Sequence, residues 1–118
     1  NQVAQQSDYR VETITESRRV FSDATRTLEI HKIASPHADA MLVAWLPAEG
    51  ILFQADLIEA PARGVAQRGA NAEATMHLAN VIRDKGWIVK TFAGAHATLQ
   101  SPAEFETLVR LPILPPAQ

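Results

Sequence analysis

Two continuous apolar runs near the middle of the chain predict a β-hairpin. Residues 41–46 (MLVAWL) and 51–53 (ILF) have the length of strands, and the turn-forming residues Pro47 and Gly50 lie between them. Proline can open a tight turn, and glycine can adopt the left-handed backbone that closes one. Runs without polar alternation favour strands that are covered on both faces. We therefore expect a layered α/β structure in which helices follow this hairpin.

The segment before the hairpin has the two-residue period of strands. Residues 9–33 alternate between apolar and polar types and are rich in Val, Ile, Thr and Phe. Two or three antiparallel strands fit this pattern best. Short polar residues at positions 22–25 favour a turn between two of them.

The segment after the hairpin predicts two helices separated by a strand. Residues 71–85 carry apolar side chains at helical spacing, with Asn71 as N-cap and Gly86 as terminator. Residues 87–92 (WIVKTF) predict a strand. Ser101 and Glu104 form a capping box with proline at the first helical position, so we expect a short helix to about Arg110. Residues 60–69 predict a loop, and the proline-rich tail predicts extended chain.

Composition limits the classes of protein to consider. With 118 residues, 47% of them apolar and 20% charged, residues 1–118 are expected to form a single domain with a core of its own. A net charge of −2 without a basic run argues against nucleic acid, and no apolar stretch reaches the length of a membrane span. Because the chain has no cysteine, His, Asp and Glu are the only candidate ligands for a transition metal. The compartment stays open.

Three polar residues lie where predicted strands meet loops. His37 precedes the first apolar run, Asp56 follows the second, and His96 follows the strand predicted at residues 87–92. Side chains at strand ends can converge on one edge of a sheet. Neutral imidazole and carboxylate are suitable ligands for zinc, and three of them leave a position for an activated water. Without a compact ligand motif, however, scattered His and Asp residues are more often structural or solvated.

The order of these features resembles the second half of metallo-β-lactamase-fold proteins. The resemblance rests on SPHADAMLVAWLP (35–47), LFQADL (52–57) and AGAHA (93–97), and it covers nearly the whole chain. In that family a His opens a strand pair and an Asp closes it, and a last His follows a later strand. The resemblance implies half of the family's αββα sandwich, a mixed and mainly antiparallel sheet with about two helices on one face.

The same resemblance implies roles for the three candidate metal ligands. His37 would complete the histidine set of a first zinc ion, Asp56 would bridge two ions, and His96 would serve the second. Ala97 stands where the family has glycine, and the signature His-x-His-x-Asp-His of the preceding half does not occur in this sequence. The complete family site holds one or two zinc ions. A chain with only these three ligands is therefore expected to be a poor hydrolase and to hold one zinc ion or none.

Two functional hypotheses follow. In the first, the chain is the C-terminal segment of a zinc-dependent hydrolase and needs a missing N-terminal half, which agrees with a sequence that opens on Asn1 instead of methionine. In the second, it is a non-catalytic module that covers its exposed sheet with a second copy and keeps vestigial ligands, so the isolated chain is a homo-oligomer. A weaker variant retains one metal ion across such a dimer. The substrate is not specified.

Other polar and aromatic residues have simpler explanations. His31, in an alternating strand, and His77, on the predicted helix, are expected to be solvent-facing or partly buried structural residues. Asp39 could form a His-x-Asp metal motif with His37, but a loop carboxylate at the start of a strand is more often a turn former or solvated. Trp45 and Trp87 are expected to pack in the core.

Overall fold

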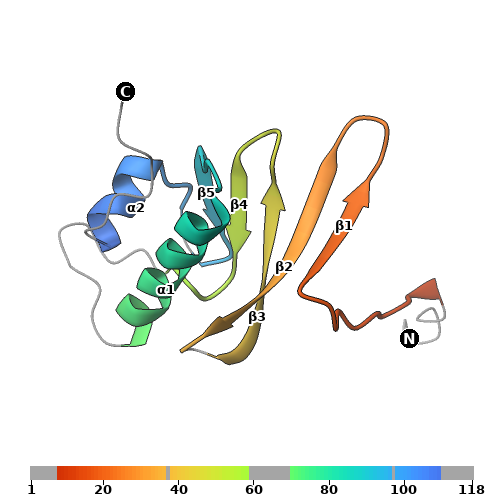
Figure 1. Ribbon diagram of the computed structural model, residues 1–118, viewed down its shortest axis with the longest axis horizontal. Helices are drawn as coiled ribbons and strands as arrows, with labels where there is room; N and C mark the ends of the chain where they lie inside the picture. The colour runs from red at the N-terminus through yellow and green to blue at the C-terminus, as the bar shows by residue number, and fades with distance from the viewer. Residues whose placement is uncertain (1–7, 37, 59–69, 97, 110–118) are drawn as a thin grey trace, which may run out of the picture.

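A five-stranded sheet with two helices forms the described part of the chain (Figure 1). The computed structural model describes residues 8–36, 38–58, 70–96 and 98–109. Across the sheet the strands follow chain order: β1 (Arg18–Ser22), β2 (Thr27–Ser35), β3 (Ala38–Leu46), β4 (Ile51–Gln54) and β5 (Thr91–Gly94). The helices are α1 (Ala70–Lys85) and α2 (Pro102–Val109). Strands β1 to β4 pair antiparallel, whereas β5 pairs parallel with β4.

Polar side chains close the first hairpin, as the sequence predicts. The carboxylate of Asp23 accepts hydrogen bonds from the backbone N–H groups of Thr25 and Arg26, at 2.7 and 2.8 Å. The backbone N–H of Asp23 also donates to the carbonyl of Arg26 at 3.0 Å. A short side chain that binds its own backbone in this way stabilises the reversal between β1 and β2.

Gly50 ends the connection between β3 and β4 and also anchors β5. Its φ of 67° is the left-handed conformation expected from the sequence, and its N–H donates to the carbonyl of Leu46 at 2.8 Å. The carbonyl of Gly50 accepts from Lys90 at 2.7 Å and from Thr91 at 3.1 Å. The predicted hairpin is confirmed, and its turn holds the start of the neighbouring parallel strand.

The helix ends follow local rules, with one correction. Gly86 has a φ of 67°, and the N–H groups of Gly86 and Trp87 donate to the carbonyls of Arg83 and Ile82, both at 3.1 Å. This pair of bonds is the Schellman motif, so the terminator prediction is confirmed. Asn71 lies inside α1, which begins at Ala70, so the prediction of Asn71 as N-cap was wrong. A polar residue within the first helical turn can imitate a cap in the sequence pattern.

The capping box of α2 is formed in both directions. The backbone N–H of Ser101 donates to Glu104 Oε2 at 2.8 Å, and the N–H of Glu104 donates to Ser101 Oγ at 3.2 Å. Pro102 is the first residue of α2, as expected. The helix is described to Val109, and Arg110 lies outside the described residues.

The core lies between one face of the sheet and the two helices. Every second residue of the central strands points into this core and packs against the helices. Two aromatic pairs are stacked within it: Trp45 with Trp87, at 5.2 Å between ring centroids, and Phe92 with Phe105, at 4.1 Å. Both tryptophans are buried, as predicted. Such pairs add to the large apolar area that aromatic side chains remove from water. Phe105 thereby fixes α2 against β5.

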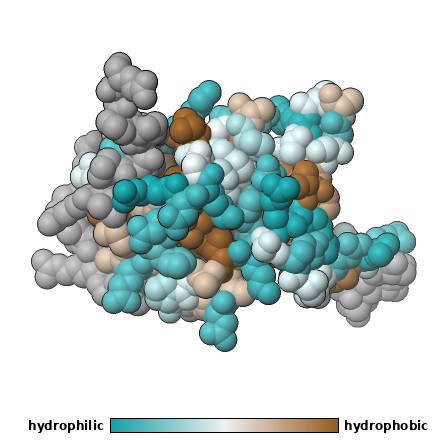
Figure 2. Space-filling model, in the orientation of Figure 1, coloured by the Kyte–Doolittle hydropathy of each residue, from teal (hydrophilic) through white to brown (hydrophobic). Residues whose placement is uncertain are grey.

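Neither α1 nor α2 covers the opposite face of the sheet. On the central strand β3, Val43 and Trp45 on the helical face are buried, whereas Leu42 on the opposite face is 49% exposed. We call this surface the open face, and its apolar residues are Phe21, Leu28, Ile30, Leu42, Ala44, Leu46, Ile51, Phe53 and Ala93. By contrast, Figure 2 shows that the helical side, in the orientation of Figure 1, is mostly hydrophilic.

Two strand predictions need correction. Strand β5 covers Thr91–Gly94, so residues 87–89 lie before it, although Trp87 and Val89 are buried. Their apolar character reflects packing against the core and not strand pairing. Residues 9–15 form no strand either, and Val11 is 93% exposed. Among the described residues, two strands, β1 and β2, precede β3, which is the lower of the two numbers expected.

Among the described residues, no helix has both the length and the apolar character to cross a membrane.

Candidate metal centre

Two of the three predicted metal ligands lie side by side at one edge of the sheet. Asp56 follows β4 and His96 follows β5, and these strands run parallel, so both chains leave the sheet at the same end. His96 Nε2 lies 3.1 Å from Asp56 Oδ1. The side chains are 62% and 41% exposed, respectively, so a metal ion from solution could reach them.

The third predicted ligand, His37, lies outside the described residues. Its chain neighbours, Pro36 and Ala38, follow β2 and begin β3. Because β3 is antiparallel to β4, Ala38 at the start of β3 lies toward the same end of the sheet as the end of β4 (Figure 1). The assignment of His37 as a ligand stays a prediction.

The geometry of Asp56 and His96 suits two ligands of one zinc ion. With bonds near 2.0 to 2.2 Å, two donor atoms on a tetrahedral ion lie about 3.4 Å apart. The observed 3.1 Å between Nε2 and Oδ1 is close to that separation, and it also allows a direct hydrogen bond. Among the residues that the structure describes, no group of three or more His, Cys, Asp or Glu side chains could hold a metal ion. Asp56 and His96 alone would supply two ligands, fewer than the three protein ligands of a typical catalytic zinc site.

Buried polar groups fix the turn that carries Asp56. The side-chain Oε1 of Gln54 accepts from the N–H groups of Leu57 and Ile58 at 2.7 and 3.0 Å. Thr75 Oγ1, from α1, donates to the carbonyl of Leu57 at 2.6 Å. Sequence reasoning missed both residues. The one available signal was an amide side chain at the end of a strand whose neighbours are apolar.

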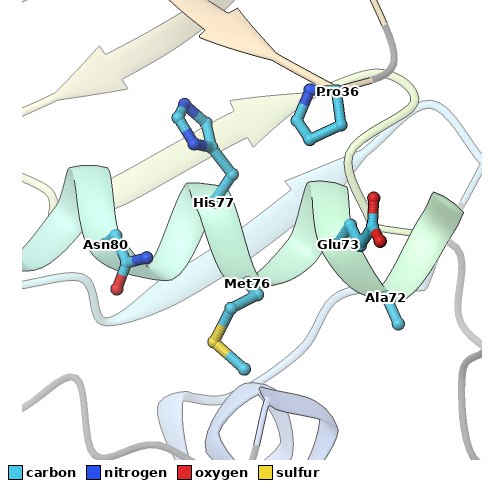
Figure 3. Close-up of a pocket in the computed structure, with 6 residues that line it drawn as sticks. All are labelled: Pro36, Ala72, Glu73, Met76, His77 and Asn80. Atoms are coloured by element: carbon cyan, nitrogen blue, oxygen red, sulfur yellow. The ribbon is translucent and has the colours of Figure 1, made fainter. Parts of the chain in front are cut away.

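Next to the β2–β3 connection, a shallow groove of about 510 Å³ crosses α1 but does not form a convergent site. Figure 3 shows that His77 points to the side of the helix on which Pro36 lies, whereas Met76 points to the other side. The remaining lining residues are Ala72, Glu73 and Asn80. Side chains that diverge around a helix cannot hold a small ligand from several directions. Half-buried His77 agrees with the structural role expected for it.

His31 has a structural role inside the core. It is 4% exposed, and its Nε2 lies 2.8 Å from Glu29 Oε1, while its ring meets Trp87 edge-on at 4.7 Å between centroids. Burial lowers the pKa of His31, against the opposing effect of its hydrogen bond to Glu29. The side chain is thus more buried than the sequence suggested. Asp39, by comparison, is exposed on β3.

Sequence comparisons with known proteins found no relative. No protein-family model matches the chain. No curated protein matches it either.

Solved structures, in contrast, share the fold. A metallo-β-lactamase from Pontibacter korlensis superposes with a TM-score of 0.60 at 17% identity, over 83% of this chain and 47% of its own. An archaeal metallo-β-lactamase superfamily protein from Sulfolobus tokodaii gives 0.53 at 17% identity, over 80% and 36%. A stereoselective inverting sec-alkylsulfatase from a Pseudomonas species gives 0.55 at 18% identity, over 82% and 16%.

The extent of these superpositions matches the architecture of the sheet. The chain spans about half the length of the first of these structures, and less of the other two. Identities this low concern the fold and leave activity open. A mixed five-stranded sheet, with two helices on one face and an open face on the other, is what one layer pair of a four-layered sandwich requires. The chain therefore has the fold of about half of a metallo-β-lactamase sandwich.

Proposed function

We propose that this chain is the C-terminal segment of a zinc-dependent hydrolase of the metallo-β-lactamase superfamily, and that it is inactive alone. The observation that carries the proposal is the 3.1 Å approach of His96 to Asp56 at the edge of a half-sandwich. His37 is the third ligand that we assign to this site. The remaining ligands would come from a second layer pair that covers the open face.

The residues of this chain would supply only part of the ligand set of the metal centre. Zinc would supply Lewis-acid activation of water for hydrolysis. Asp56 would contribute a carboxylate and His96 an imidazole, and both side chains are partly exposed to solvent. Because the His-x-His-x-Asp-His run is absent from the sequence, the chain lacks the groups that would complete a two-metal centre. Substrate binding and turnover therefore depend on that second layer pair.

Zinc titration tests the ligand assignment. Asp56→Asn, His96→Asn and His37→Asn are each expected to weaken zinc binding to the chain by roughly tenfold or more, since the loss of a direct ligand exceeds the effect of its supporting groups. Asp39→Asn and His77→Asn are matched controls that should leave the affinity unchanged. Calorimetry and elemental analysis measure the result. Zinc uptake that none of the three ligand variants weakens contradicts the assignment.

Hydrolysis assays test the inactivity of the isolated chain. A β-lactam and a secondary alkyl sulfate are suitable substrates, because structures with the same fold are named for those activities. We expect no turnover above that of the Asp56→Asn variant, with or without added zinc. Zinc-dependent turnover that Asp56→Asn abolishes would show that the chain alone is an enzyme.

The open face favours a second candidate function, a self-associating structural module. Apolar side chains from all five strands gather there, and contiguous exposed apolar surface marks interaction sites in soluble proteins. A second copy of the chain could cover this surface in place of another layer pair. Light scattering on the purified chain separates the candidates, since a monomer at all concentrations speaks against the module.

A further inference from the structure

We propose that Gln54 and Thr75, together called the turn clamp, are positioning residues that hold Asp56 against His96. The inference rests on the proposed function, in which these two side chains share a zinc ion. It concerns residues that contact neither the metal nor a substrate. Their role would be to fix the backbone from which the ligands project.

Gln54 binds the turn that follows Asp56. It is the last residue of β4 and is 1% exposed, so its amide group must find partners inside an apolar core. Its Oε1 accepts from the N–H groups of Leu57 and Ile58, at 2.7 and 3.0 Å. Its Nε2 donates to the carbonyl of Ile58 at 3.5 Å. The two short bonds fix the chain immediately after the ligand.

The backbone of Gln54 also reaches the second ligand turn. Its carbonyl accepts a hydrogen bond from the N–H of Ala95 at 3.1 Å, one residue before His96. Gln54 and Gly94 are register partners in the parallel pair of β4 and β5. A single residue therefore binds the turn of Asp56 through its side chain and the turn of His96 through its main chain.

Thr75 holds the same turn from α1. Its Oγ1 donates to the carbonyl of Leu57 at 2.6 Å, and the side chain is 1% exposed. Leu57 is thus bound at its N–H by Gln54 and at its carbonyl by Thr75. The side chain of Asp56, in contrast, is 41% exposed. Its position is set by the clamp, in the manner of the supporting groups around metal ligands.

An NMR double-mutant experiment on the full chain tests the clamp without added metal. The measured quantity is the change in the His96 ring Cε1–H chemical shift, at constant pH, when Asp56 is replaced by Asn. In the Gln54→Met background, we expect this change to be less than roughly half of its value in the wild-type background. Methionine keeps the side-chain length of glutamine but removes its hydrogen bonds. Thr75→Val should reduce the chemical-shift change as well, and Thr75→Ser, which retains the hydroxyl, should restore it.

Ile82→Ala is the control for general loss of stability. Ile82 is buried near the C-terminal end of α1, away from Thr75, so this variant should lower Tm while leaving the chemical-shift change intact. Circular dichroism identifies folded variants. If Gln54→Met does not fold, the comparison of the chemical-shift change in Thr75→Val with that in Thr75→Ser decides the question. An unchanged shift in folded Thr75→Val and Gln54→Met, or an equal loss in Ile82→Ala, overturns the proposal.

Zinc affinity, measured with Zn²⁺ alone, then separates this inference from the proposed function. Where the wild type binds zinc, Thr75→Val is expected to weaken binding by roughly tenfold and Thr75→Ser to recover it. Zinc binding that neither Asp56→Asn nor His96→Asn weakens, in a chain that shows the clamp-dependent shift, refutes the metal assignment and leaves the positioning role in place.

Discussion

Among single residues, His31 gives the core a dependence on pH. Its imidazole is buried on β2 beside Glu29 and against Trp87, and burial lowers its pKa below 6.5. Arg18 from β1 and Lys85 from α1 also disfavour the protonated form. In the unfolded chain the same group takes up a proton near pH 6.5. The unfolded state therefore binds more protons between the two pKa values, and stability rises with pH there.

Urea unfolding at several pH values tests this linkage. The contribution of His31 is fully present above about pH 6.5 and is lost as pH falls through its lower folded-state pKa, so the free energy of unfolding should drop between about pH 7.5 and 5.5. His31→Phe should flatten the dependence, because no proton is then taken up at this position. His77→Asn should retain it. An unchanged slope in His31→Phe would assign the effect to another group.

The candidate site shows how far single residues can be interpreted from the sequence. Asp56 and His96 were identified because their residue types and family context are visible along the chain, and the structure places them 3.1 Å apart. Gln54 and Thr75 were not, because a hydrogen bond between a strand, a turn and a helix leaves no local pattern. For His37 the assignment as a ligand stays a prediction.

At the scale of elements, the two glycines with positive φ differ in what surrounds them. Gly86, at the end of α1, has no heavy atom within 4 Å of an added Cβ. At Gly50 an added Cβ would lie 2.9 Å from Lys90 Cγ and 3.1 Å from the carbonyl oxygen of Ile88. The first position therefore requires only the left-handed backbone, whereas the second also requires space.

Alanine substitution should separate these two costs. Gly86→Ala is expected to destabilise the chain by about 1–2 kcal/mol, the cost of the left-handed conformation. Gly50→Ala should cost more, because the segment that leads into β5 must also move. Chemical denaturation of both variants measures the difference. Equal losses of stability in the two variants would mean that Lys90 moves away from the added methyl group at no cost. The turn would then not constrain the position of β5.

Elements set by neighbouring residues were predicted well, and those set by distant contacts were not. The hairpin turns, the Schellman motif and the capping box each depend on a few consecutive residues. Strand β5 was expected at residues 87–92 and lies at Thr91–Gly94, because its register is fixed by β4 and by the carbonyl of Gly50. The apolar character of Trp87 correctly predicts that it is buried, but it does not indicate whether the residue belongs to a strand.

For the whole molecule, the open face predicts association through the sheet. Phe53→Lys and Leu42→Lys would place charges on this face while touching little of the core, since both side chains are nearly half exposed. If copies associate there, each variant should weaken the dimer by roughly tenfold or more, about 1.4 kcal/mol, with little change in Tm.

Leu99→Lys provides the matched control for this test. Leu99 is an exposed apolar residue that belongs to no strand of the sheet. Sedimentation equilibrium across a range of concentrations measures all three variants. If Leu99→Lys disrupts the dimer as strongly as Phe53→Lys, the association does not run through the open face.

The parallel pairing of β4 with β5 also predicts an order of folding. Strands β1 to β4 meet their partners across short turns, whereas Ile51 must wait for Thr91, which lies beyond α1 in the chain. Closing this long loop costs more entropy and slows the step that depends on it. Asp56 and His96 come together only when that loop closes. The candidate metal centre would therefore be among the last parts of the molecule to form, and among the first to come apart.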